Sequence, residues 1–439
     1  MVVISKWPYH TNNRTIGTTG NGVGIVALTG TGLVASGGYS HAEGRDNVAS
    51  GDYSWSSGRT DTASGTSSVA MGQQNKTIGA YSFSTGYMNV AAYQSSVALG
   101  QENRDSGWSS MAAGLRNKIY NTISYSNTLG YANEIRGGSA NNLLGESNVI
   151  NSGSGNTASG YGNNITGNYN QLLGKGNRVN AGNSHFLGGE GNWAKSGSAN
   201  TLLGNNNVAD GNYMAAIGKD NSVFYQTGIA MGQNNADSGF ASITGGLSNV
   251  ANRNVQYSAV FGYNNIASKN LSLLSANGGS GMFSAGIANY NSGYASVALG
   301  SSNRSTAISS FAANNKTIAN SYSMSAFGHF NDTLIAYQGA SNQAREMLFA
   351  IGNGTGETNR RNSFTMLRNG FTTINASGQA GANEPRAELD VKGTGAIIVP
   401  VGTTAQRPQT PVAGMIRFCT DCPGGPVLQG FDGTNWVNL

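Results

Sequence analysis

Two cysteines near the end of the chain, Cys419 and Cys422, are the residues whose spacing most directly suggests chemistry. Cysteines three residues apart can close a small disulfide loop, or their thiolates can bind a metal ion. One chain offers only these two thiolates, so a metal site would need ligands from three chains. We therefore expect a disulfide or two free thiols here, and no metal.

Paired carboxylates would indicate a different chemistry, because glycoside hydrolysis uses two Asp or Glu side chains. The chain has only 20 acidic residues, and the densest group is Glu384, Glu388 and Asp390, next to a proline and before a predicted strand. Within the regular part of the chain the carboxylates seldom recur at equivalent positions. We expect no catalytic residue, no cofactor and no enzymatic activity.

The remaining candidate groups also favour structural roles. The four histidines, His10, His41, His185 and His329, lie far apart and lack Cys or acidic partners at ligand spacing. The Gly-Asn-Gly segments at 20–22 and 352–354 lead into no helical pattern, so we expect turns there and not phosphate-binding loops. The net charge is only +5, and the basic residues are scattered, so no nucleic-acid partner is expected.

A 14-residue repeat organises most of the chain and must position all of these groups. Its most regular column is glycine: Gly44, Gly58, Gly72, Gly86, Gly100 and Gly114. A serine stands four residues before each glycine, and Ala or Ser stands two before. Three residues after the glycines come Asn47, Asp61, Asn75, Asn89, Asn103 and Asn117. With small slips the pattern continues to about residue 331, which gives roughly 22 coils.

This period predicts an all-β fold, a parallel β-roll solenoid of ~14-residue coils. Each coil holds two short strands joined by two tight turns. The glycines, and a second set seven residues later such as Gly51 and Gly65, mark turns where φ is positive. The Asn or Asp beside them tolerates the left-handed region and can bond its own backbone. Coils stacked ~4.8 Å apart would form a rod on the order of 100 Å long.

One outward column is too apolar for a lone roll. The small residues of the strand point into the thin interior, so the larger residues three before each glycine point out. Leaving that stripe in water is opposed by about 25 cal/mol per Å². We therefore predict a homotrimer whose interface includes the following side chains: Val69, Phe83, Val97 and Met111.

Exposed aromatic residues are the candidates for recognition of a partner, although no receptor-binding residue can be assigned. They cluster in neighbouring coils: Tyr53, Trp55, Tyr81, Tyr93 and Trp108. Aromatic faces suit sugar rings and protein anchors. The alternative, which we favour for Trp55 and Phe83, is packing at the trimer axis.

The repeat resembles a known family. Residues 96–103 (SVALGQEN) and 296–303 (SVALGSSN) are similar to the head repeats of YadA-like trimeric autotransporter adhesins. The resemblance covers about 310 residues and implies a left-handed parallel β-roll assembled as a trimer. Those adhesins also carry a signal peptide, a coiled-coil stalk and a membrane anchor. We find no such patterns here and expect neither export through a signal peptide nor membrane insertion.

The C-terminal part resembles other proteins. Residues 348–355 (LFAIGNGT) and 362–370 (NSFTMLRNG) are similar to a module common in phage tail fibres. Residues 387–395 (AELDVKGTG) and 399–408 (VPVGTTAQRP) resemble the terminal module of many phage fibre and appendage proteins. These resemblances imply a virion appendage.

Four parts are therefore predicted. They are an N-terminal virion-attachment segment (1–18), the β-roll repeat (19–331), a β transition segment with a linker (332–386) and a C-terminal β module (387–439). In the first part, Trp7, Pro8 and Tyr9 are the candidate virion anchor.

The functional hypothesis that follows is a homotrimeric bacteriophage fibre, assembled in the host cytoplasm and located on the virion. It would contact other virion proteins, of tail, baseplate or capsid, and a glycan or protein of the host surface. Two alternatives stay open: a bacterial trimeric surface adhesin, and a tailspike that depolymerises polysaccharide.

Overall fold

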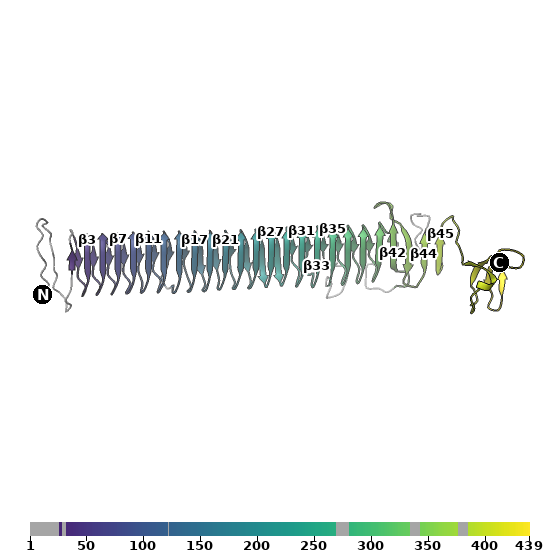
Figure 1. The fold of residues 1–439 in the computed structure, drawn as a ribbon, viewed down its shortest axis with the longest axis horizontal. Helices are drawn as coiled ribbons and strands as arrows, with labels where there is room; N and C mark the ends of the chain where they lie inside the picture. Colours follow the sequence, from purple (N-terminus) through teal and green to yellow (C-terminus); the bar gives the residue numbers. More distant parts are fainter. Residues whose placement is uncertain (1–25, 29–31, 122, 269–280, 334–342, 376–384) are drawn as a thin grey trace.

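The computed structural model describes residues 26–28, 32–121, 123–268, 281–333, 343–375 and 385–439. The predicted anchor residues Trp7, Pro8 and Tyr9 lie outside these ranges, as does Glu384. Across the described residues the fold is almost entirely β, and its one helical element is the 3-10 turn η1 (Thr404–Gln406). Figure 1 shows a long, straight stack of strands that makes up most of the molecule.

Two parallel sheets form the stack, and each coil adds one strand to both. The long-strand sheet takes one five-residue strand from each regular coil: β1 (Val26–Leu28), β3 (His41–Arg45), β5 (Trp55–Arg59), β7 (Val69–Gln73), β9 (Phe83–Tyr87), β11 (Val97–Gln101), β13 (Met111–Leu115), β15 (Asn127–Tyr131), β17 (Asn142–Glu146), β19 (Thr157–Tyr161), β21 (Gln171–Lys175), β23 (Phe186–Glu190), β25 (Thr201–Asn205), β27 (Ala215–Lys219), β29 (Ile229–Gln233), β31 (Ile243–Leu247), β33 (Ala259–Tyr263), β35 (Phe283–Ile287), β37 (Val297–Ser301), β39 (Phe311–Asn315) and β41 (Ser325–His329).

The short-strand sheet lies opposite and is built mostly from two-residue strands: β2 (Val34–Ala35), β4 (Val48–Ala49), β6 (Thr62–Ala63), β8 (Lys76–Thr77), β10 (Val90–Ala91), β12 (Arg104–Asp105), β14 (Lys118–Ile119), β16 (Glu134–Ile135), β18 (Val149–Ser152), β20 (Asn164–Thr166), β22 (Arg178–Val179), β24 (Trp193–Ser196), β26 (Val208–Asn212), β28 (Ser222–Gln226), β30 (Ala236–Asp237), β32 (Val250–Ala251), β34 (Ile266–Ala267), β36 (Tyr290–Asn291), β38 (Arg304–Ser305) and β40 (Ile318–Ala319).

The register between coils follows the sequence repeat. Gly58 of β5 lies opposite Gly44 of β3 on one side and Gly72 of β7 on the other. Each residue therefore stacks on its equivalent in the next coil, which confirms the predicted β-solenoid of ~14-residue coils. This in-register stacking turns every column of the sequence into a continuous row along the rod.

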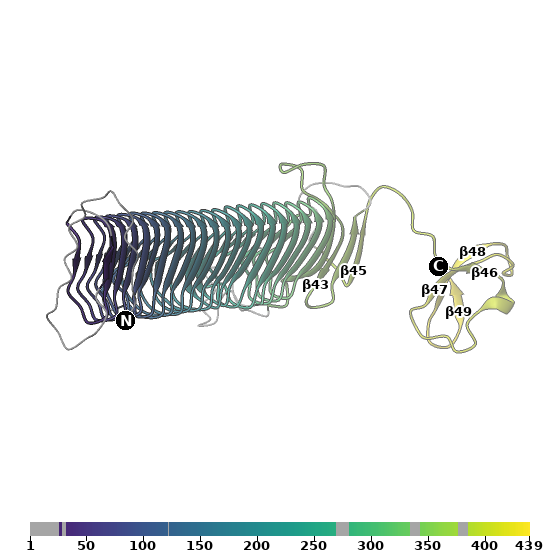
Figure 2. The same ribbon diagram turned by 60° about the vertical axis from the view of Figure 1, so that its left-hand side comes forward.

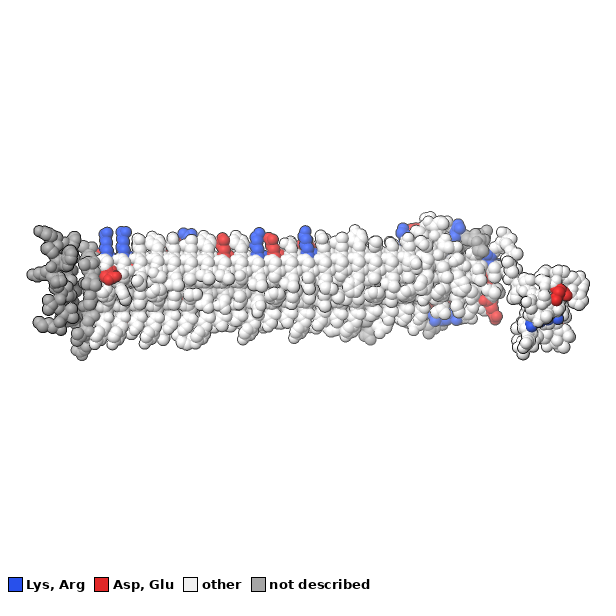
Figure 3. Space-filling view, in the orientation of Figure 1, with Lys and Arg blue, Asp and Glu red and all other residues white. Residues whose placement is uncertain are grey.

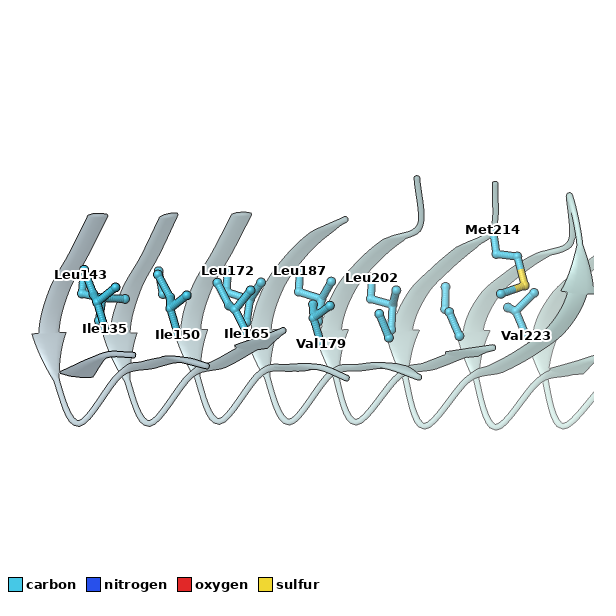
Figure 4. Packing of buried hydrophobic residues seen from close by; sticks show 14 of the residues in the cluster. Ile135, Leu143, Ile150, Ile165, Leu172, Val179, Leu187, Leu202, Met214 and Val223 are labelled. Atoms are coloured by element: carbon cyan, nitrogen blue, oxygen red, sulfur yellow. The ribbon is translucent and has the colours of Figure 1, made fainter. Parts of the chain in front are cut away.

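The interior holds small side chains near the N-terminal end and larger ones in the middle. Ala42, Ala70 and Ala98 of the long strands are fully buried, as the small column predicted. In the middle coils larger side chains fill the same space. Figure 4 shows the following side chains meeting across the interior: Ile135, Leu143, Ile150, Ile165, Leu172, Val179, Leu187 and Leu202.

The two glycine columns require glycine for different reasons. Gly86 has a φ of 116°, and a Cβ there would lie 2.0 Å from the carbonyl oxygen of Gly100 in the next coil. The other glycines of this column share the positive φ that we predicted. Gly51 and Gly65 of the second column do not have it. They are glycines because a Cβ at Gly51 would lie 2.1 Å from the carbonyl oxygen of Gly65.

The asparagine column corrects a second prediction. We expected Asn47, Asn75 and their equivalents to adopt the left-handed conformation, but that conformation belongs to the residue before each of them, such as Asp46 and Gln74. The asparagines point inward and are fully buried. Their amides bond along the rod, so their role is a hydrogen-bonded ladder and not a turn.

At the C-terminal end of the stack, some strands pair antiparallel. β42 (Met347–Asn353) continues the parallel stack, whereas β43 (Asn362–Leu367) and β44 (Thr372–Asn375) pair antiparallel. β45 (Leu389–Lys392), which we assigned to the C-terminal module, pairs with β44 and is the last strand of the long-strand sheet. This 25-stranded sheet therefore extends beyond the boundary predicted at residue 387.

A small separate sheet follows residue 400 (Figure 2). It contains four strands: β46 (Val401–Gly402), β47 (Ile416–Cys419), β48 (Val427–Phe431) and β49 (Trp436–Asn438). The guanidinium groups of Arg407 and Arg417 lie 5.9 and 5.8 Å from the ring centre of Trp436. A disulfide joins Cys419, the last residue of β47, to Cys422. The sequence left open a disulfide or two free thiols, and the structure shows the disulfide.

Candidate interaction surfaces

The first and third residues of each long strand point outward, and the surface that they form is here called the long-strand face. From residue 41 to residue 351 it contains one charged side chain among the described residues, Glu43. The other charged side chains of these strands stand at the fifth residue, as in Arg45 and Glu146. Figure 3 shows a face of the rod with very few charged groups and an edge where they gather. The predicted interface residues Val69, Phe83, Val97 and Met111 all lie on the long-strand face and are half-buried in the single chain.

Aromatic rings strengthen the apolar character of this face near its C-terminal end. Phe327 lies between Phe311 and Phe349, with ring centres 5.3 and 5.6 Å apart. Phe364 of β43 continues the row at 5.8 Å from Phe349. Such a row, open on one side to water, has apolar surface that a partner could cover.

The opposite surface, here called the short-strand face, mixes apolar side chains such as Val48, Val90 and Val250 with basic ones. The basic side chains that β8, β12, β14, β22 and β38 direct outward are Lys76, Arg104, Lys118, Arg178 and Arg304. Some of these cations lie against aromatic rings, as where Lys195 and Arg178 approach Trp193 at 4.6 and 5.3 Å. The short-strand face therefore carries more charge than the long-strand face, which makes the long-strand face the better candidate for burial against an apolar surface.

The five candidate aromatic residues lie in three places. Trp55 projects from the long-strand face and is 45% exposed. Tyr53 and Tyr81 occupy the left-handed turn position before the long strand and are 61% and 63% exposed. Tyr93 and Trp108 lie at the same edge but border the short-strand face. The structure thus separates residues that the sequence grouped together.

Sequence reasoning missed a row of tyrosines at this left-handed turn position. The row comprises Tyr39, Tyr53, Tyr81, Tyr125, Tyr169, Tyr213 and Tyr257. From Tyr81 onward they recur every 44 residues, which is every third coil, and all are exposed. The 44-residue spacing was the available signal, but it is hidden by coils of 14, 15 and 16 residues.

The candidate carboxylates do not form a catalytic pair. Glu388 is exposed, whereas Asp390 accepts hydrogen bonds from Arg386 and is close to Lys392. The bonds from Arg386 lower the pKa of the Asp390 carboxyl to about 2. A carboxyl with that pKa is ionised at neutral pH and is unsuited to act as a general acid.

The histidines are likewise separate from one another. His41 pairs with Glu43 at 3.2 Å, and His329 is exposed. His185 is buried within the coil, and burial lowers its pKa. His10 lies outside the described residues. Within those residues no three His, Cys, Asp or Glu side chains lie together as metal ligands would.

Comparison with known proteins gives no assignment. No protein-family model matches the chain, and no curated protein matches it. In the part of the chain that the structure describes, no helix is both long and apolar enough to cross a membrane.

Proposed function

We propose that the chain forms a homotrimeric fibre of a bacteriophage virion, which attaches the particle to the surface of the host cell. The long-strand face is the observation that carries this proposal. This nearly uncharged strip is rich in apolar side chains towards both ends of the solenoid, and in a single chain those side chains would remain in water. Three copies packed around a common axis would cover all three strips, and the cost of exposing them would be removed.

The shape supports a fibre. Stacked coils at ~4.8 Å give a rod on the order of 100 Å long, and each coil contacts mainly its neighbours. A stiff rod of this kind separates what is bound at one end from what is bound at the other. Its partners would be virion proteins at one end and a host glycan or protein elsewhere.

The C-terminal part supports a phage origin through its resemblance to fibre and appendage modules, described above. Strands β42, β43, β45 and β46 lie in or overlap the segments that carry this resemblance. The proposed location is therefore the virion.

Two measurements test the proposal. Light scattering of the purified chain should give three times the chain mass of 45.2 kDa. A single-chain mass would overturn the trimer. Gold-labelled antibody against the chain should decorate phage particles in electron micrographs, and the purified protein should block their adsorption to host cells. Label confined to the bacterial surface would overturn the virion location and favour the adhesin alternative.

A further inference from the structure

A segment of the solenoid occurs twice, 132 residues apart. Tyr93-Gln94 recurs as Tyr225-Gln226, and Asp105-Ser106-Gly107 recurs as Asp237-Ser238-Gly239. The aspartates do not belong to the 14-residue repeat, because other described coils lack Asp at the position of Asp105. The duplicated segment therefore specifies a local feature that the 14-residue repeat alone does not.

Both copies are followed by a coil of 16 residues, from Gly114 to Gly130 and from Gly246 to Gly262. The added length is accommodated at the same turn. The backbone N–H of Trp108 donates to the carbonyl of Ile123 at 2.8 Å. The backbone N–H of the equivalent Phe240 donates to the carbonyl of Val255 at 2.9 Å. The aromatic ring at this position packs against a tyrosine in both copies: Trp108 on Tyr125 and Phe240 on Tyr257.

The two buried aspartates hold these turns in the same way. Asp105 Oδ1 accepts hydrogen bonds from the Ser110 hydroxyl at 2.5 Å and from the Gly107 N–H at 3.0 Å. Asp237 Oδ1 accepts the equivalent bonds from the Ser242 hydroxyl and the Gly239 N–H. The duplicated sequence thus builds the same local structure twice.

An open groove lies beside each turn, where the edge meets the short-strand face. The first has a volume of about 530 Å³, and its lining includes Tyr93, Gln94, Arg104, Ser106, Trp108 and Asn121. The second, of about 590 Å³, includes Asn212, Phe224, Tyr225, Gln226, Ser238 and Arg253. Tyr, Gln and Ser stand at equivalent positions in both, and the two tyrosines are 56% and 53% exposed.

Each groove also contains one guanidinium group, but from different positions. Arg104 corresponds to Ala236 in the second copy, and Arg253 corresponds to Asn121 in the first. Neither arginine makes an ion pair with a described residue. Asp210 borders the second groove, and its carboxylate accepts a hydrogen bond from Ser196. A cation that is present in both grooves at unrelated positions indicates a ligand with negative charge.

We infer that the two grooves bind the same ligand, a polysaccharide that carries carboxylate groups. The tyrosine offers a flat apolar face to a sugar ring, Gln and Ser can bond its hydroxyls, and the arginine can bind a carboxylate. Nine coils separate the grooves, which is about 43 Å at ~4.8 Å per coil. A long polymer can therefore occupy both grooves of one chain, which raises its avidity.

Both grooves open away from the long-strand face, so they stay accessible in the proposed trimer. The inference rests on the proposed function, because it names the class of host-surface ligand that the fibre would bind. It predicts two ligand sites per chain, which neither the repeat nor the trimer requires.

The test uses the full chain and calorimetric titration with oligogalacturonate, hyaluronate and oligosialate fragments, with neutral dextran fragments as the comparison. At least one acidic fragment should bind at two sites per chain, and dextran should not bind. The variant Tyr93→Ala/Arg104→Ala should lose one site, Tyr225→Ala/Arg253→Ala should lose the other, and the combined variant should lose both. For a long acidic polymer, loss of one groove should weaken binding at least tenfold, because avidity is removed.

Tyr169→Ala/Arg178→Ala is the matched control, since Tyr169 is 67% exposed and Arg178 is exposed, both outside the grooves. It should retain both sites. Binding of no acidic fragment, equal binding of dextran, or full binding by the combined groove variant would overturn the inference. Adsorption of the chain to host cells is measured in parallel. If the combined groove variant adsorbs normally, the groove inference fails and the attachment function stands; if wild type does not adsorb, the attachment function itself fails.

Discussion

The side-chain amide of Asn103 donates to Oδ1 of Asn89, one coil earlier, at 3.1 Å. The same oxygen also accepts the backbone N–H of Asn103 at 3.0 Å. The amide of Asn103 further donates to the carbonyls of Leu99 and Gly114. One buried side chain thus satisfies groups in three successive coils, and repetition of this pattern forms a ladder along most of the solenoid. Each unsatisfied buried member weakens such a network.

Asp61 is the weak member of this ladder. Its Oδ1 accepts two bonds from Asn75, but Oδ2 is buried without a partner, and burial raises the pKa of the carboxyl. Asp61→Asn would restore the missing donor, so we expect it to stabilise the fold by about 1–2 kcal/mol at pH 7. A higher midpoint in thermal unfolding followed by circular dichroism would show this.

The reverse change is the control. Asn103→Asp removes the donor to Leu99 and Gly114 and buries a charge, so the midpoint should fall. If both substitutions shift the midpoint in the same direction, the ladder does not act as described.

The sequence predicted the fold well because the period of 14 is expressed in columns that stack in register. Side-chain direction could also be predicted, since residues alternate along each strand. The asparagine ladder was missed because Asn is common both in turns and in buried ladders, and only the backbone shows that Asp46, and not Asn47, has the positive φ. The grooves were missed because their residues come from three or more coils, and the duplication lies beneath a stronger short repeat.

Gly86 tests the close approach of neighbouring coils. Gly86→Ala would place a methyl group against the carbonyl of Gly100 at a backbone φ of 116°. We expect a loss of about 3 kcal/mol or more, or failure to fold. Gly162→Ala is the control, because Gly162 also has a positive φ, of 65°, but no atom within 4 Å of an added Cβ. It should cost about 1 kcal/mol. Equal losses in chemical denaturation would contradict a role for coil contact.

The buried aspartates of the two turns should make stability depend on pH. Burial raises the pKa of Asp105 and of Asp237 to about 6, from the ordinary value of 3.8. Between these values the folded chain binds more protons than the unfolded chain, so stability falls as pH rises from about 4 to about 6. Above pH 6 each carboxylate costs about 3 kcal/mol.

Asp105→Asn should therefore stabilise the fold at pH 7, by about 2 kcal/mol once the lost bond from the Val97 N–H is counted. Asn291 shows that the position accepts an amide, because its Oδ1 accepts the hydroxyl of Ser296 in the same arrangement. The difference between the unfolding midpoints at pH 5 and pH 7 should shrink in this variant, and the unchanged Asp237 should account for part of what remains. The exposed Asp52→Asn serves as control and should leave the pH dependence unchanged.

His185 should have the opposite pH dependence. Its Nδ1 accepts the N–H of Asn200, and Nε2 lies 3.3 Å from the carbonyl of Ala181, so the buried ring is held neutral. Burial lowers its pKa below the ordinary value of 6.5. As pH falls below about 6.5 the unfolded chain takes up a proton that the folded chain does not, so stability is lost. His185→Asn, matching Asn170 and Asn200 in the same column, should reduce this loss, while His329→Asn at the exposed position should not.

The long-strand face should determine the oligomeric state. Val97→Asp/Val297→Asp places two carboxylates on this face in each chain, and a trimer would bring three copies of each together around its axis. Burying unpaired like charges costs several kcal/mol, so we expect the trimer to dissociate or fail to assemble. Val90→Asp/Val250→Asp is the matched control, because these valines are also half-buried but belong to the short-strand face. Light scattering should give a single-chain mass for the first variant and a three-chain mass for the second. A three-chain mass for both would show that the subunits meet through another surface.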